Sequence, residues 1–336
     1  MSQRIVSLDL IKGIAILLVI IAHCIQFGSG QEYLRNELFF DNSIFKFIYS
    51  YHMPLFMIVS GYLFYFTLFR NPFLIVLKSR FTKLLIPILI WQTIWLLCFE
   101  DSLFTDSNKS IWLSYINTQW FITSVFINSL FVLLCKKLFN DSLYVYIGVI
   151  IVSLFIPNYH SESLYVFMFP YFLLGYLYNK HITIFNRQKY TFPTFICITI
   201  AFCLMLPFYD KCDYVYTSGT FIIRNHHFYF HQLIIDIYRW VIGVVGSLEI
   251  LFIFNYISQR WSNCILVKGI CHIGTKTMGI YIVSTYIFKK FHLLPINQQE
   301  CIYIIIEVII VTFLSYFVVL LLEHNKHTRK SLLGGR

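Results

Sequence analysis

The sequence is poor in charge, since Asp, Glu, Lys and Arg together make up only 12% of its 336 residues. An average soluble domain carries about 25%. Hydrophobic residues reach 58%, aromatic residues reach 19%, and the mean hydropathy is +0.70. A water-soluble fold cannot hide that much apolar surface from solvent, so this class of protein is excluded.

Several enzyme signatures are also missing from the sequence. It has no phosphate-binding loop, no Gly-x-Ser-x-Gly elbow and no paired catalytic carboxylates. The nine cysteines fall mostly inside apolar runs without paired or metal-type spacing, which is typical of small core residues. His227 and His231 are four residues apart but lack an obvious third ligand, so we expect no metal site. No repeat or linker divides the chain, and we expect one transmembrane domain over residues 1–336.

Long apolar runs are what the sequence does contain. Inside a bilayer every backbone polar group must be paired within the protein, and runs of ~17 or more apolar residues achieve this as helices. We therefore predict an all-α integral membrane protein. It is a bundle of about ten transmembrane helices, near residues 8–27, 44–67, 84–100, 118–135, 143–157, 163–180, 190–208, 232–257, 269–288 and 301–323.

The net charge of +10 sits in short clusters between the apolar runs rather than along one stripe, so we expect no nucleic-acid partner. Most lysines and arginines fall in alternate loops, which places those loops and both termini in the cytoplasm. Residues 70–83 mix aromatics with four cations and are expected at the cytoplasmic headgroup level. Residues 209–231 form the longest outer segment, where contact with a polar substrate is possible.

The first predicted helix carries three polar side chains on one face. The eleven-residue step from Lys12 to His23 turns through about 1100°, so both lie within ~20° of one line, about 16.5 Å apart. Asp9 lies within ~40° of the same stripe. An ionisable side chain at this depth is costly and usually faces the bundle interior or a water-filled cavity. The alternative is that His23 bonds a neighbouring helix and that Lys12 merely extends to the headgroups.

The second predicted helix opens with His52 and Pro54, and Ser60-Gly61-Tyr62 follows. Pro54 frees the carbonyl about four residues earlier and bends the chain, which can open a polar pocket around His52. Simple helix packing, with a small-residue contact at Ser60-Gly61, explains the same pattern equally well. His23 and His52 lie in consecutive antiparallel helices, so one cavity can hold both.

At these residues the chain resembles the membrane acyltransferase-3 family, the bacterial integral-membrane acyltransferases that modify sugars and surface polysaccharides. The segment from Leu8 to His23 matches the family's pattern of a basic residue, a ten-residue gap and a histidine. The run from His52 to Phe56, followed by Ser60-Gly61-Tyr62, matches its second-helix signature. Weaker matches lie at Arg80 to Pro87, Trp120-Phe121, Phe169 to Tyr176 and Gly274 to Tyr281.

The resemblance implies transfer of an acetyl group from cytoplasmic acetyl-CoA to a sugar hydroxyl presented from the outer side of a bacterial cytoplasmic membrane. Lys12, Arg80 and Lys83 are then expected to bind the CoA phosphates. His23 acts as general base or carries the acetyl group, and His52 polarises the thioester carbonyl or holds the acceptor. Asp9, Ser60 and Trp120 are expected to support the site. The partners are the bilayer, acyl-CoA and the sugar or polysaccharide acceptor, with a homo-oligomer left open.

The chain departs from the family pattern near its ninth predicted helix. Many relatives read Tyr-Leu-Leu-His there, whereas this chain reads Tyr281-Ile282-Val283-Ser284, so any role of that histidine is absent. Two other readings stay open at this point. One is a transporter or flippase of a lipid-linked sugar, and the other is a non-catalytic membrane subunit of polysaccharide assembly.

Overall fold

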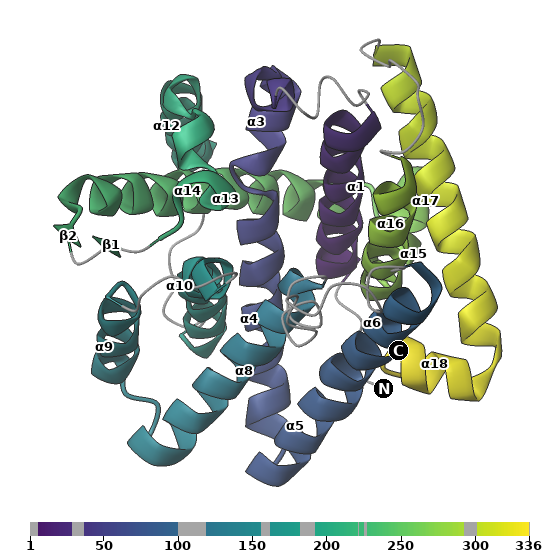
Figure 1. The fold of residues 1–336 in the computed structure, drawn as a ribbon, viewed down its shortest axis with the longest axis horizontal. Helices are drawn as coiled ribbons and strands as arrows, with labels where there is room; N and C mark the ends of the chain where they lie inside the picture. Colours follow the sequence, from purple (N-terminus) through teal and green to yellow (C-terminus); the bar gives the residue numbers. More distant parts are fainter. Residues whose placement is uncertain are drawn as a thin grey trace. The chain divides into compact units, whose positions relative to one another are not determined.

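A computed structural model of the chain describes residues 6–28, 37–99, 119–155, 162–181, 192–220, 222–224, 227–291 and 301–335 (Figure 1). The described part is almost entirely helical. Its elements are α1 (Val6–Gly28), η1 (Leu38–Asp41), α3 (Ser43–Tyr49), α4 (His52–Arg70), α5 (Phe73–Arg80), η2 (Phe81–Leu85), α6 (Ile86–Phe99), α8 (Trp120–Phe139), α9 (Leu143–Ser153), α10 (Glu162–Lys180), α12 (Phe192–Met205), η4 (Leu206–Phe208), η5 (Lys211–Asp213), α13 (Val215–Ser218), β1 (Ile223–Arg224), β2 (His227–Phe228), α14 (Phe230–Arg260), α15 (Ile265–Gly274), α16 (Thr277–Phe291), α17 (Cys301–His324) and α18 (Lys326–Leu332).

Helix was predicted at ten places, and the structure has helix at each of them. Among the described residues, five helical stretches are long and apolar enough to cross a membrane, at Val6–Phe27, Ser43–Arg70, Trp120–Phe139, Phe230–Arg260 and Ile302–His324. Shorter apolar helices lie at Leu143–Ser153, Phe192–Phe208, Ile265–Gly274 and Thr277–Phe288. The all-α membrane class is confirmed, while the count of ten spans and the cytoplasmic termini stay predictions.

Helix α17 shows most directly that this chain needs a bilayer. Only 17% of its apolar window is buried inside the protein. Its large exposed side chains include Ile302, Ile305, Ile309 and Phe313, which lie on successive turns. Exposing an apolar face of this length to water is unfavourable, whereas contact with lipid tails costs nothing.

One boundary prediction was wrong. The ninth predicted helix, near 269–288, is two helices, because α15 ends at Gly274 and α16 begins at Thr277. The hydroxyl of Thr275 donates to the carbonyl of His272, and the Lys276 amide donates to the carbonyl of Ile273. These local bonds close a turn that hydropathy does not register.

The chain forms two compact units. Unit 1 comprises residues Met1–Val59, Thr183–Tyr214 and Ile237–Leu321. Helix α1 is its centre and packs against α15, α16 and α3. Ile16, Ile20 and Ala22 of α1 and Ile280 and Ile282 of α16 are fully buried.

Unit 2 comprises residues Ser60–Ile182, Val215–Asp236 and Leu322–Arg336. Helix α8 packs against α10, α5 and η2, and α18 packs against α6. A two-stranded antiparallel hairpin pairs Ile223 with Phe228 and Arg224 with His227.

Three helices of unit 2 end at the same place. The Lys136 ammonium, in the last turn of α8, donates to the carbonyl of Leu68 near the end of α4 at 3.3 Å. Lys180, the last residue of α10, pairs with Asp141 just beyond α8. The carbonyl ends of helices attract cations, so lysines stabilise this junction.

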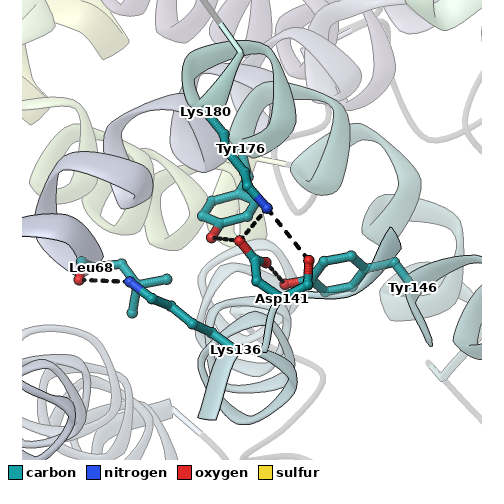
Figure 2. Close-up of polar contacts among 6 residues, drawn as sticks. All are labelled: Leu68, Lys136, Asp141, Tyr146, Tyr176 and Lys180. Atoms are coloured by element: carbon teal, nitrogen blue, oxygen red, sulfur yellow. Dashed lines mark hydrogen bonds and ion pairs between the residues drawn. The ribbon is translucent and has the colours of Figure 1, made fainter. Parts of the chain in front are cut away.

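Asp141 is the centre of this junction (Figure 2). Its carboxylate accepts hydrogen bonds from the hydroxyls of Tyr146 at 2.5 Å and Tyr176 at 2.9 Å. The Lys180 ammonium lies 2.6 Å from the same carboxylate, and the Asp141 side chain is only 12% exposed. Asp141 also adopts a left-handed backbone, with φ 60°. One side chain thus ties α8, α9 and α10 together.

Candidate active site

His23 lies in α1 and is partly buried in unit 1. Its Nδ1 lies 3.2 Å from Oε1 of Gln26, one turn further along the helix. The imidazole lies between two phenyl rings, with centroid distances of 5.7 Å to Phe27 and 5.4 Å to Phe288. Gln26 and the two rings restrict both the position and the rotation of the imidazole.

His52 is the first residue of α4 and is buried, with 2% of its surface exposed. Helix α3 ends before a turn at Ser50–Tyr51, close to the place where Pro54 predicted a bend. Pro54 itself sits in the first turn of α4, where its missing N–H is not needed. The turn lets Nδ1 of His52 reach the carbonyl of Ile48 at 2.9 Å. The Tyr49 ring stands edge-on to the imidazole at 4.7 Å.

These bonds determine which ring nitrogen carries the proton. The Ile48 carbonyl only accepts hydrogen bonds, so His52 donates from Nδ1 and its Nε2 keeps the lone pair of the neutral ring. The Gln26 oxygen has the same effect on His23. The two imidazoles are close enough for a charge on one to act on the other. Unit 1 therefore holds two neighbouring imidazoles, each with the lone pair of its neutral ring on Nε2.

Lys12 and Asp9 form an ion pair on α1, with Nζ 2.8 Å from Oδ1. This part of α1 touches α15 backbone to backbone. A Cβ added to Gly13 would lie 2.2 Å from the carbonyl oxygen of Ile270, and one added to Gly274 would lie 1.8 Å from that of Asp9. Only glycine permits this contact at both positions, and the contact fixes where the ion pair stands.

Arg80 and Lys83 belong to unit 2. The Arg80 guanidinium stacks over the Phe64 ring at 4.6 Å, and Lys83 is exposed. Lys83 lies in η2, a single π-helical turn over Phe81–Leu85. Such turns are rare and occur frequently at functional sites. Because Lys12 is in unit 1, the prediction that all three cations bind one donor stays a prediction.

The C-terminal segment adds cations that the sequence analysis did not assign to the donor site. The Trp91 indole donates to the carbonyl of Leu332 at 2.9 Å, which ties α18 to α6. Gly334 follows at φ +67°, and a Cβ there would lie 2.4 Å from the carbonyl oxygen of Lys83. The segment therefore lies beside η2. It brings three exposed cations, Lys326, Arg329 and Lys330.

Ser60 and Trp120, the two other supporting candidates, also lie in unit 2. Ser60 is partly buried in α4, and its neighbour Gly61 meets the backbone of α10, because a Cβ there would lie 1.9 Å from the carbonyl oxygen of Phe172. Gly61 is thus the small-residue packing contact that the pattern allowed. Trp120 begins α8, with its ring 6.3 Å from that of Tyr216.

An apolar helical protein with two neighbouring neutral imidazoles, and with exposed cations at η2 and α18, is suited to group transfer at a membrane. Residues 5–324 match the family described as "Acyltransferase domain". The chain therefore belongs to the membrane acyltransferase-3 family, as its first two helices indicated.

Two curated relatives are both called "Nodulation protein NolL". The protein from Mesorhizobium japonicum is 32% identical over 231 residues, which cover 66% of this chain and 61% of the relative. The protein from Sinorhizobium fredii is 25% identical over 308 residues, covering 88% of this chain and 81% of the relative. The first alignment thus spans less than two thirds of the relative's length. No solved structure matches the chain significantly.

Proposed function

We propose that the protein transfers an acetyl group from cytoplasmic acetyl-CoA to a sugar hydroxyl of a cell-surface polysaccharide or of its lipid-linked precursor. Its location is the bacterial cytoplasmic membrane. The observation that carries the proposal is the pair of imidazoles in unit 1, each holding its proton on Nδ1 within a family of acyltransferases. A neutral imidazole of this tautomer is ready to accept a proton at Nε2.

In this mechanism Nε2 of His23 takes the proton from the sugar hydroxyl as its oxygen attacks the thioester carbonyl carbon. The carbon–sulfur bond then breaks, and the CoA thiolate leaves and takes the proton back from the imidazolium. The products are the sugar acetyl ester and CoA. Gln26 accepts from Nδ1–H throughout, so it stabilises the imidazolium as well as the neutral ring.

The donor phosphates need cations. Lys12, Arg80 and Lys83 fill this role, and Lys326, Arg329 and Lys330 of α18 add charge beside Lys83. Charge-assisted bonds to phosphate are strong where water is partly excluded. Arg80 also offers a planar guanidinium whose stacking on Phe64 limits its freedom.

The test is acetyl-CoA binding and turnover by the purified protein in detergent, with wild type compared with His23→Ala. The variant is expected to bind acetyl-CoA but to lose transfer by a factor of at least 100, the usual contribution of a general base. His324→Ala, which changes an exposed histidine at the end of α17, is the control and is expected to keep full activity.

Failure of the folded wild type to bind or consume acetyl-CoA would overturn the donor assignment and favour transport of a sugar lipid. Loss of membrane insertion by His23→Ala would instead indicate that the histidine is structural.

A further inference from the structure

Gln119 has a buried polar side chain at the start of α8. It caps the N-terminal end of α8 with 0% of its surface exposed. Its backbone carbonyl is occupied, because it accepts from both the amide and the hydroxyl of Thr123. Neither side-chain atom, Oε1 or Nε2, has a hydrogen-bond partner among the residues that the structure describes.

This arrangement requires a partner from outside the described chain. Buried polar groups in native proteins are nearly always hydrogen-bonded, and an amide left alone loses both its donor and its acceptor bonds to water. A ligand that satisfies Gln119 must accept from the NH₂ group and donate to the carbonyl oxygen. A hydroxyl does both, and neighbouring hydroxyls on a sugar ring do so in pairs.

Two aromatic residues, Trp120 and Tyr216, belong to the same unit as Gln119. Trp120 follows it directly, and its ring stands edge-on to that of Tyr216, whose side chain is 56% exposed. Aromatic faces with a few fixed polar groups are typical of small-molecule sites. Tyr216 lies in α13, inside the segment predicted to contact a polar substrate from the outer side.

A second buried hydroxyl lies on the same segment. Thr220 is 0% exposed, and its Oγ1 has no hydrogen-bond partner within the described ranges. The preceding residue is held in place, because Nε2 of Gln232 donates to the carbonyl of Gly219 at 2.9 Å. All of these residues belong to unit 2.

The position along α8 agrees with an outer site. Gln119 lies 17 residues before Lys136, and at 1.5 Å per residue the two are about 25 Å apart along the helix. Lys136 marks the cation-rich end where α4 and α8 terminate. Gln119 therefore stands at the opposite end of the helix, which the distribution of lysines and arginines in the loops predicts to be the outer end.

We propose that Gln119, together with Trp120 and Tyr216, binds the acceptor through a sugar hydroxyl. The proposal rests on the acyltransferase function and names the residues that select its acceptor. Gln119 donates from its amide nitrogen and accepts at its amide oxygen, while the rings of Trp120 and Tyr216 contact the apolar face of the sugar.

The experiment uses the full-length protein in detergent, acetyl-CoA as donor and the surface carbohydrate extracted from the cells that make the protein as acceptor. In Gln119→Leu the half-saturating concentration of carbohydrate is expected to rise about tenfold or more, as lost hydrogen bonds predict. The KM for acetyl-CoA stays unchanged. The melting temperature does not fall, because an apolar side chain of similar size replaces unpaired polar atoms.

Tyr216→Ala provides a second variant, since replacing an exposed ring does not endanger folding. It is expected to raise the same half-saturating concentration, by about threefold to tenfold. Tyr144→Ala is the matched control, because Tyr144 is 86% exposed on α9 and lies outside the proposed site.

A Gln119→Leu variant with wild-type half-saturation for carbohydrate, or with a lower melting temperature as its only change, would overturn the acceptor assignment alone. The same holds if Tyr216→Ala behaves like Tyr144→Ala. If the wild type itself does not acetylate the extract, the acyltransferase proposal fails, and the acceptor site fails with it.

Discussion

Asp141 offers a quantitative test of how unit 2 is held together. Replacing it with Asn keeps the size of the side chain and one acceptor oxygen but removes the charge that Lys180 meets at 2.6 Å. Hydrogen bonds to charged groups contribute about 1.5–3 kcal/mol each. The pair is partly exposed, which lowers its worth. We expect Asp141→Asn to lower the free energy of unfolding by about 2 kcal/mol.

Asp141→Ala is expected to cost more than Asp141→Asn for a separate reason. Asp141 has a left-handed backbone with φ 60°. Asn tolerates this conformation nearly as well as Asp, whereas Ala does not, and the penalty is about 1–2 kcal/mol. The Ala variant also leaves the hydroxyls of Tyr146 and Tyr176 without their acceptor. We expect a loss of about 4 kcal/mol.

The assay is chemical unfolding of the purified protein in detergent, with thermal unfolding as a second measure. Lys180→Met and the double variant with Asp141→Asn complete a double-mutant cycle that isolates the ion pair. Acetyl transfer per folded molecule is expected to stay at the wild-type level in every variant. Equal stability of Asp141→Asn and wild type, or of the Asn and Ala variants, would refute the reasoning.

Three further predictions follow from the structure. Gly274→Ala should lower the melting temperature markedly, because its Cβ meets a backbone carbonyl, whereas Gly269→Ala in the same helix has nothing within 4 Å and should be neutral or stabilising. His52→Asn keeps a donor for the Ile48 carbonyl near the position of Nδ1, so the variant should fold normally. If Nε2 takes part in acetyl transfer, its loss should lower activity by about 100-fold. Undiminished acetyl transfer would make His52 purely structural. Burial raises the pKa of Asp213. The protonated carboxyl therefore contributes stability at low pH, and this contribution is lost as the pH rises through the raised pKa. Thermal unfolding measured across pH should show a weaker decline in Asp213→Asn than in wild type.

Much of the fold could be predicted because apolar length is a local property. Helix occurs at each of the ten predicted places, and Pro54 indicated the turn before His52. The break between α15 and α16 was missed, since hydrogen bonds around Thr275 rather than polarity end the helix there. The junction at Asp141 was also missed. Its partner Tyr176 is 35 residues away along the chain, so local patterns do not reveal the contact.

The residues of the candidate site could also be predicted only in part. His23, Lys12 and Asp9 share a helix, so their common face could be worked out from the sequence. Gln26 was overlooked although its spacing of three residues from His23 is a known contact distance on a helix. Gln119 could not be found, since being buried without a partner depends on the folded environment.

The glycine contacts between α1 and α15 have a mechanical consequence. Where two helices touch backbone to backbone at Gly13 and at Gly274, neither can slide or roll without collision. The pair therefore moves as one stiff element that carries Lys12 with it. The helical geometry ends just beyond this contact, at the turn of Thr275 and Lys276.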